Sequence, residues 1–172
     1  MNKLKIISKV LKIMNHPVIF VDMDGVLADY DHGFDGKKPE SIPKMWEEVG
    51  EKGVSFWVDL KLMPGAKELW NYVKKYDPII LSAYPNPKKN GMKMVKDAIK
   101  GKRIWLKENF GEDVAKKAII KTRAEKSNYA KENTILIDDL IGNIIEFNEA
   151  GGKGIHHTST AKTIEKLKKM GL

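Results

Sequence analysis

The sequence contains no cysteine among its 172 residues. This absence excludes a disulfide-stabilised scaffold, a zinc site with thiolate ligands and a cysteine nucleophile, and it suits a reducing cytosol. No apolar run approaches the roughly 18 residues that a membrane-spanning helix needs. We therefore expect a cytoplasmic protein that does not act in a membrane.

Residues 1–14 predict a short amphipathic helix packed on the domain. Lysines interrupt the apolar residues of this segment, which disfavours a secretory signal and leaves a helix on a membrane surface as the alternative. The apolar residues recur at helical spacing: Leu4, Ile7, Leu11 and Met14.

Negative charge is in short supply, because 31 lysine and arginine residues face 23 acidic residues, for a formal net charge of +8 at pH 7. A basic surface favours anionic partners. We expect a small phosphorylated molecule as the partner, with a nucleic acid as the alternative. The oligomeric state does not follow from the sequence.

Short apolar runs rich in Ile and Val alternate with helical patterns along the chain. The runs predict strands at 17–21, 78–81, 118–120 and 134–137, with a weaker one at 153–156. Helices are expected from Pro64, around 92–106 with a break at Gly101, and at 124–131, 141–147 and 160–170. This alternation predicts an α/β fold, a three-layer Rossmann-like parallel sheet with right-handed crossovers.

One segment breaks the alternation. Residues 29–63 lie between the first strand and its helix, show no clear strand and contain several aromatic residues. We interpret them as a small inserted cap, so that residues 1–28 and 64–172 form the core.

Polar residues collect where the predicted strands end, the edge at which open parallel sheets bind ligands. Two acids follow the first strand, a serine and an alanine the second, cations the third, and two acids the fourth. These residues are Asp22 and Asp24, Ser82 and Ala83, Arg123 and Lys126, and Asp138 and Asp139.

Four carboxylates at one edge would repel one another unless a cation lay among them. Hard oxygen ligands without histidine or cysteine point to Mg²⁺. A lysine and a hydroxyl nearby supply an anion site. Together these groups favour phosphoryl transfer to an aspartate.

The motifs resemble those of the haloacid dehalogenase superfamily of aspartate-nucleophile phosphatases. Four stretches stand in the superfamily's order at strand ends: "DMDGVLAD", "ILSAYP", "TRAEK" and "ILIDD". Within that superfamily the chain is similar to the 5′(3′)-deoxyribonucleotidase family and its phage and bacterial relatives, through "FWVDLKLMPGAKELW" and "IWLKENFG". The segment interpreted as a cap looks shorter than that family's.

The resemblance implies a role for each candidate residue. Asp22 would attack phosphorus and form an aspartyl-phosphate, while Asp24 would act as general acid and then general base. The Asp22 carboxylate, the Asp24 backbone carbonyl and one acid of the Asp138 and Asp139 pair would bind Mg²⁺. The residues expected to contact the phosphate are Ser82, Ala83, Lys126 and Arg123.

Each assignment has a structural alternative. Asp22 and Asp24 suit a turn, Asp138 and Asp139 suit a helix cap, and Ser82 suits a cap as well. Lys121 and Lys131 lie near Lys126 and compete for its role, and Arg123 could be a surface charge.

Four aromatic residues of the inserted segment are candidates for stacking on a base, or for a core of the segment's own. They are Phe34, Trp46, Phe56 and Trp57.

We therefore expect a Mg²⁺-dependent phosphatase that acts on nucleoside monophosphates. The alternatives are a polynucleotide 3′-phosphatase, for which a basic helix face from Lys89 to Lys107 would be suited, and a phosphatase for another small metabolite. The non-enzyme alternative is a phosphate- or nucleic-acid-binding module on an inactive scaffold. Clustered acids argue against that alternative, because they would repel the phosphate.

Overall fold

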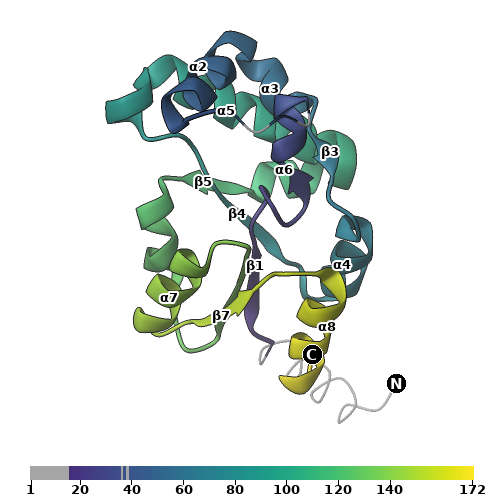
Figure 1. Cartoon of the computed structure of the whole chain (residues 1–172). Helices are drawn as coiled ribbons and strands as arrows, with labels where there is room; N and C mark the ends of the chain where they lie inside the picture. The colour runs from purple at the N-terminus through teal and green to yellow at the C-terminus, as the bar shows by residue number, and fades with distance from the viewer. Residues whose placement is uncertain (1–15, 36, 38) are drawn as a thin grey trace.

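The computed structural model describes residues 16–35, 37 and 39–172 (Figure 1). The helix expected at residues 1–14 lies outside this range. Among the helices of the described part, none is both long and apolar enough to cross a membrane.

Five parallel strands form the central sheet, in the order β5-β4-β1-β6-β7. Each predicted strand is found within two residues of its expected ends. The strands are β1 Val18–Val21, β4 Ile79–Ala83, β5 Ile119–Lys121, β6 Thr134–Asp138 and β7 Lys153–His156. Because β1 lies in the middle, the residues that follow it are flanked by the ends of β4 and β6.

Helices cover both faces of the sheet, which confirms the three-layer α/β prediction. On one face Phe20, Leu81 and Leu136 pack against α7 (Ile141–Glu149), beside the 3-10 helix η3 (Arg123–Tyr129). On the other, Ile19 and Val21 belong to the cluster that includes the inner residues of four helices. These are α4 (Ala66–Val73), α5 (Pro87–Phe110), α6 (Glu112–Lys117) and α8 (Thr160–Lys169).

Three helix predictions need correction. The break in α5 falls at Gly91, which has φ 76° and ψ 160°, whereas Gly101 lies within the continuous helix. The helix expected at 124–131 is a 3-10 helix, and α6 was not anticipated. A short 3-10 helix, η2 (Lys74–Tyr76), also follows α4.

The segment 29–63 is mostly helical and begins and ends in a short antiparallel pair. Strand β2 (Ala28–Asp29) pairs with β3 (Lys61–Leu62), and each has only two residues, so neither gave a sequence signal. Between them lie η1 (Asp31–Phe34), α2 (Ile42–Lys52) and α3 (Val54–Val58). Figure 1 shows α2, α3 and α5 together at the top of the molecule.

Gly101 allows α3 to lie directly on α5. A methyl group at Gly101 would lie 2.6 Å from the Trp57 Cβ and 2.7 Å from the Val54 carbonyl oxygen. The backbone oxygen can move away only if α3 moves with it. The sequence therefore needs glycine here for a close helix contact, although glycine otherwise weakens a helix.

We predict that Gly101→Ala destabilises the protein by about 1–3 kcal/mol, as overpacking typically does. Helix propensity alone would give the opposite sign, a gain of up to about 1 kcal/mol. Urea unfolding measures the difference, with Lys100→Ala on the exposed side of α5 as the control. Unchanged or increased stability of Gly101→Ala would show that α3 does not press on this helix.

Candidate active site

Asp22 and Asp24 extend beyond the central strand at its carboxyl end. The Asp22 amide donates to the Ile137 carbonyl at 2.9 Å, so β1 still pairs with β6 at this residue. Asp22 is buried and its Oδ1 accepts a hydrogen bond from the Met23 amide at 2.8 Å. Met23 points into the core and is fully buried, as strand alternation predicts.

Gly25 follows because two constraints meet at this position. Its φ is +73°, a value that residues with a Cβ rarely adopt. In addition, a methyl group at Gly25 would collide with the carboxylate of Asp139. Glycine therefore lets the loop after β1 approach the loop after β6.

Asp138 is the last residue of β6, and both oxygens of its carboxylate accept hydrogen bonds. Its Oδ1 accepts from the Leu140 amide, its Oδ2 from Lys126 Nζ at 2.7 Å, and both oxygens from Asn143 Nδ2 at 2.9 Å. Asp139 is only partly buried, and within the described chain no other side chain donates to its carboxylate. The two neighbouring acids therefore have different surroundings.

Oxygens of Asp22, Asp138 and Asp139 lie within 4.8 Å of one another. Lys126 Nζ is 2.8 Å from Asp22 Oδ2 and also pairs with Asp138, so its one positive charge faces three carboxylates. A hard divalent cation fits this set, because every available ligand is an oxygen and two negative charges are left uncompensated.

The pKa values of these groups reflect the same excess of negative charge. Burial raises the pKa of the Asp22 carboxyl to about 8 against the opposing charge of Lys126, and Asp138 and Asp24 add to the rise. Burial and then the charge of Asp138 raise the pKa of Asp139 to about 6. Burial lowers the pKa of Lys126, but Asp22 and Asp138 outweigh it and raise that pKa to about 12. Ionising both acids therefore destabilises the folded chain unless a cation joins them.

Lys102 was missed by the sequence analysis and is fully buried beside the site. Its Nζ donates to Asp24 Oδ2 at 2.5 Å, to Ser82 Oγ at 2.8 Å and to the Ala83 carbonyl at 2.7 Å. The available signal was its position in α5, where it shares the apolar side of the helix with Ala98 and Trp105.

Asn143 was also missed, and it connects Asp138 to Arg123. Its Oδ1 accepts from Arg123 Nε at 2.7 Å while its amide nitrogen donates to Asp138. Arg123 also pairs with Glu146 at 2.8 Å. A polar residue on the buried side of the predicted helix, next to Ile144, was the signal that could have identified Asn143.

A cavity of about 900 Å³ opens over these groups. Asp22, Asp24, Asp139, Lys126 and Arg123 line one part of it, and its remaining wall is largely apolar. That wall contains Tyr30, Ile42, Met45, Trp46, Trp57, Met63, Tyr84, Pro85 and Leu140.

The candidate aromatics separate into two pairs. Trp46 and Trp57 line the cavity. Phe34 and Phe56 are buried, pack against each other with ring centroids 5.0 Å apart, and are not among the lining residues. Of the predicted phosphate contacts, Ala83, Arg123 and Lys126 line the cavity, whereas Ser82 is fully buried behind it.

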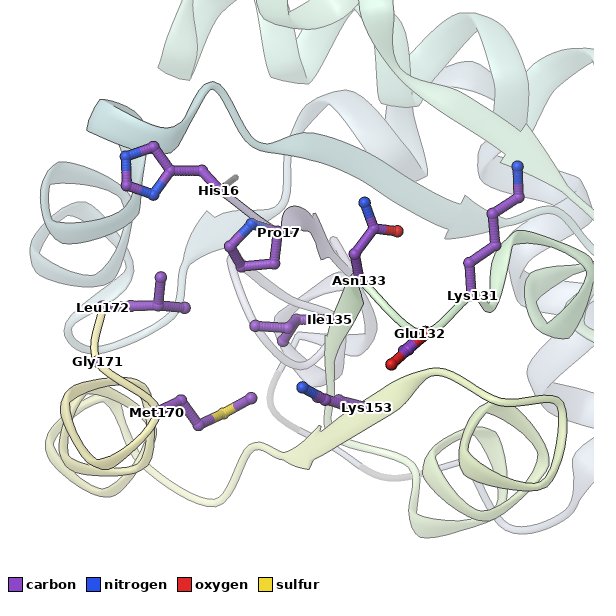
Figure 2. A pocket seen from close by; sticks show the side chains of 10 residues that line it. All are labelled: His16, Pro17, Lys131, Glu132, Asn133, Ile135, Lys153, Met170, Gly171 and Leu172. Atoms are coloured by element: carbon purple, nitrogen blue, oxygen red, sulfur yellow. The ribbon is translucent and has the colours of Figure 1, made fainter. Parts of the chain in front are cut away.

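A second cavity, of about 840 Å³, lies at the opposite ends of the strands (Figure 2). Pro17 and Asn133 precede β1 and β6, and Lys153 begins β7. Lys131, a competitor for the phosphate role, lines this cavity and therefore lies at the wrong end of the sheet. None of the predicted site residues contributes to it.

Neither a family model nor a curated protein matches the sequence. Among solved structures, a hydrolase from Streptococcus pneumoniae TIGR4 is 12% identical with a TM-score of 0.50, over 90% of this chain and 100% of that chain. A HAD-superfamily hydrolase from Ehrlichia chaffeensis is 12% identical with a TM-score of 0.48, over 92% and 100%. At 12% identity, the likeness to the Streptococcus pneumoniae structure shows the fold alone.

We predict that Mg²⁺ stabilises the protein, because it would relieve the repulsion among the three carboxylates. At one hundred times the dissociation constant the gain is about 2.7 kcal/mol, which corresponds to a rise in Tm of roughly 5–10 °C. Thermal unfolding with and without Mg²⁺ measures it.

The Mg²⁺ effect should shrink strongly in Asp139→Asn and persist in Asp113→Asn, which changes an exposed acid of α6 as the control. An equal rise in Tm for the wild type and Asp139→Asn would mean that the cation binds elsewhere.

Proposed function

We propose that the protein is a Mg²⁺-dependent phosphatase of the haloacid dehalogenase superfamily, acting on nucleoside monophosphates. One observation carries the proposal: Asp22, at the end of the central strand, is paired with Lys126 at 2.8 Å and lies beside two further acids at the base of a cavity. A structural ion pair needs neither the extra acids nor the cavity. An aspartate nucleophile needs both.

Asp22 provides the attacking oxygen. A bond forms between its carboxylate and phosphorus as the bond from phosphorus to the leaving oxygen breaks, and Asp24 gives a proton to that oxygen. Asp24 then takes a proton from the water that attacks phosphorus, and Asp22 is released with inorganic phosphate. Both side chains line the cavity, so both can reach a bound phosphate ester.

Asp22 and Asp139 are the proposed carboxylate ligands of Mg²⁺, which when bound would neutralise charge on the phosphoryl oxygens. Asp139 keeps its oxygens available within the described structure, whereas those of Asp138 already accept from Lys126, Asn143 and the Leu140 amide. We therefore assign Asp138 a supporting role, in which it orients Lys126.

The phosphate contacts follow from which donors are still available. An ammonium has three protons, and Lys126 uses two of them on Asp22 and Asp138, so one can reach a phosphoryl oxygen. The Ser82 hydroxyl accepts from Lys102 and lies fully buried behind the cavity, so we assign it no direct phosphate contact. Arg123 donates from Nε to Asn143 and from one terminal nitrogen to Glu146, and among the described residues its other terminal nitrogen has no partner.

The leaving group would occupy the apolar part of the cavity. Trp46 and Trp57 stand in that wall together with Tyr30 and Tyr84, and flat aromatic walls suit a base. Asp29 and Asp31 also line the cavity, and their charge disfavours a second phosphate or a polynucleotide.

Several basic side chains of α5 already have partners within the protein, so this face is less available to bind a polyanion than its sequence suggests. Lys93 pairs with Asp97 at 2.7 Å and Lys107 with Glu112 at 2.6 Å. Arg103 donates to the Ala115 and Ala118 carbonyls and so connects α5 to α6. These pairings support a mononucleotide as substrate over a polynucleotide.

A screen of phosphate release tests the function. Nucleoside monophosphates are expected to turn over faster than sugar phosphates, phosphoserine or 3′-phosphorylated oligonucleotides, and chelation of Mg²⁺ should abolish the activity. Trp46→Ala should lower kcat/KM for the preferred nucleotide by about 5- to 150-fold, equivalent to one lost stack of roughly 1–3 kcal/mol.

The control variant is Phe34→Leu, which alters the buried aromatic pair and replaces no residue of the cavity wall. It should lower stability and leave the substrate preference intact. Equal losses in Trp46→Ala for a nucleotide and for a plain aryl phosphate would argue against base recognition by this wall. Fastest release from oligonucleotides would favour the polynucleotide alternative.

A further inference from the structure

Lys102 is a charged residue in a place where water cannot reach it. It is 0% exposed, in the middle of α5. Burying a lysine is unfavourable unless its charge is paired and its protons are used. Here the three protons have three acceptors, namely Asp24 Oδ2, Ser82 Oγ and the Ala83 carbonyl oxygen.

These contacts leave Lys102 no donor for a substrate. An ammonium has three donors and no acceptor. Lys102 is also not one of the residues that line the cavity, whereas Lys126 is. Any effect of Lys102 on a reaction must therefore pass through the groups that it holds.

The two oxygens of Asp24 differ because of this contact. Oδ2 is fixed by Lys102, while Oδ1 is shielded from solvent and, among the described residues, has no hydrogen-bond partner. Asp24 itself lines the cavity. Because Lys102 holds Oδ2, it fixes the direction in which the carboxyl group of Asp24 faces.

The segment 29–63 in turn holds Lys102. The ring of Trp57 lies 4.7 Å from Lys102 Nζ, a distance suited to a cation–π contact, and the Trp57 Cβ rests on Gly101, the preceding residue. Trp57 also lines the cavity. A continuous series of contacts therefore runs from the wall that would face the leaving group, through Lys102, to Asp24.

We propose that Lys102 is a positioning residue that orients Asp24 for proton transfer to the leaving group, with Trp57 keeping Lys102 in place. The inference rests on the proposed function, in which Asp24 is the proton donor. It predicts that loss of Lys102 harms esters that need a proton to depart and spares esters that do not.

The test compares kcat/KM of Lys102→Met for an alkyl phosphate and for p-nitrophenyl phosphate, since p-nitrophenolate departs without protonation. A general acid contributes typically about 10²–10⁴-fold. We expect the alkyl ester to lose about 10²-fold or more and the aryl ester less than about 5-fold. Inhibition by inorganic phosphate should change less than about 3-fold, because Lys102 donates nothing to phosphate.

If Lys102→Met folds poorly, a double-mutant cycle with Asp24→Asn provides a second test. Asp24→Asn combined with Lys102→Met leaves no unpaired buried charge at this contact. If Lys102 acts through Asp24, the second substitution should lower alkyl phosphate turnover by less than about 3-fold beyond Asp24→Asn alone. Lys100→Met, on the exposed side of α5, should leave all rates unchanged.

Equal losses for both esters, or additive losses in the double variant, would overturn the positioning role. Weaker inhibition by phosphate would assign Lys102 to phosphate binding and also overturn it. A folded wild type that hydrolyses neither ester with Mg²⁺ would instead refute the proposed function and this inference together.

Discussion

The meeting of Asp22, Asp138 and Asp139 at the end of the central strands is the constraint on which the rest of the structure depends. Lys126 alone cannot balance three carboxylates within 4.8 Å of one another. The nearby residues serve this cluster: Gly25 lacks the side chain that would strike Asp139, and Asn143 occupies the oxygens of Asp138. A fold that only needed stability would gain more from apolar residues here.

A second ammonium, that of Lys102, connects this cluster to the helices above it. Lys102 contacts Asp24 after β1 and Ser82 on β4, and the ring of Trp57 from α3 lies 4.7 Å from its nitrogen. Lys126 pairs with the carboxylates of Asp22 and Asp138, and Lys102 with one carboxylate, a hydroxyl and a carbonyl, yet of the two only Lys126 lines the cavity. Lys126 therefore borders the cavity directly, whereas Lys102 contacts only other groups of the protein.

The sheet and its acids were predictable because their signals are local. Runs such as "VIFV" and "TILI" identify buried strands, and the acids follow directly. Lys102 was missed because its role depends on Asp24, which is 78 positions away in the sequence. Asn143 lies only five residues from Asp138, but the helical pattern does not show that its side chain turns toward that carboxylate. Residue type likewise could not separate Trp46, in the cavity wall, from Phe34, in the buried cluster. The break in α5 was placed at Gly101 because glycine signals both a kink and a close helix contact.

The central claim is that the buried carboxylate of Asp22 is a nucleophile. The most direct measurement is mass spectrometry of the Asp22 peptide after turnover with Mg²⁺ and substrate is quenched in acid, which preserves an acyl phosphate. The account predicts a phosphoryl group on Asp22 in the wild type and none in Asp22→Asn. A wild type that releases phosphate rapidly without any phosphorylated Asp22, under conditions that trap the acyl phosphate of a known aspartate phosphatase, would contradict it.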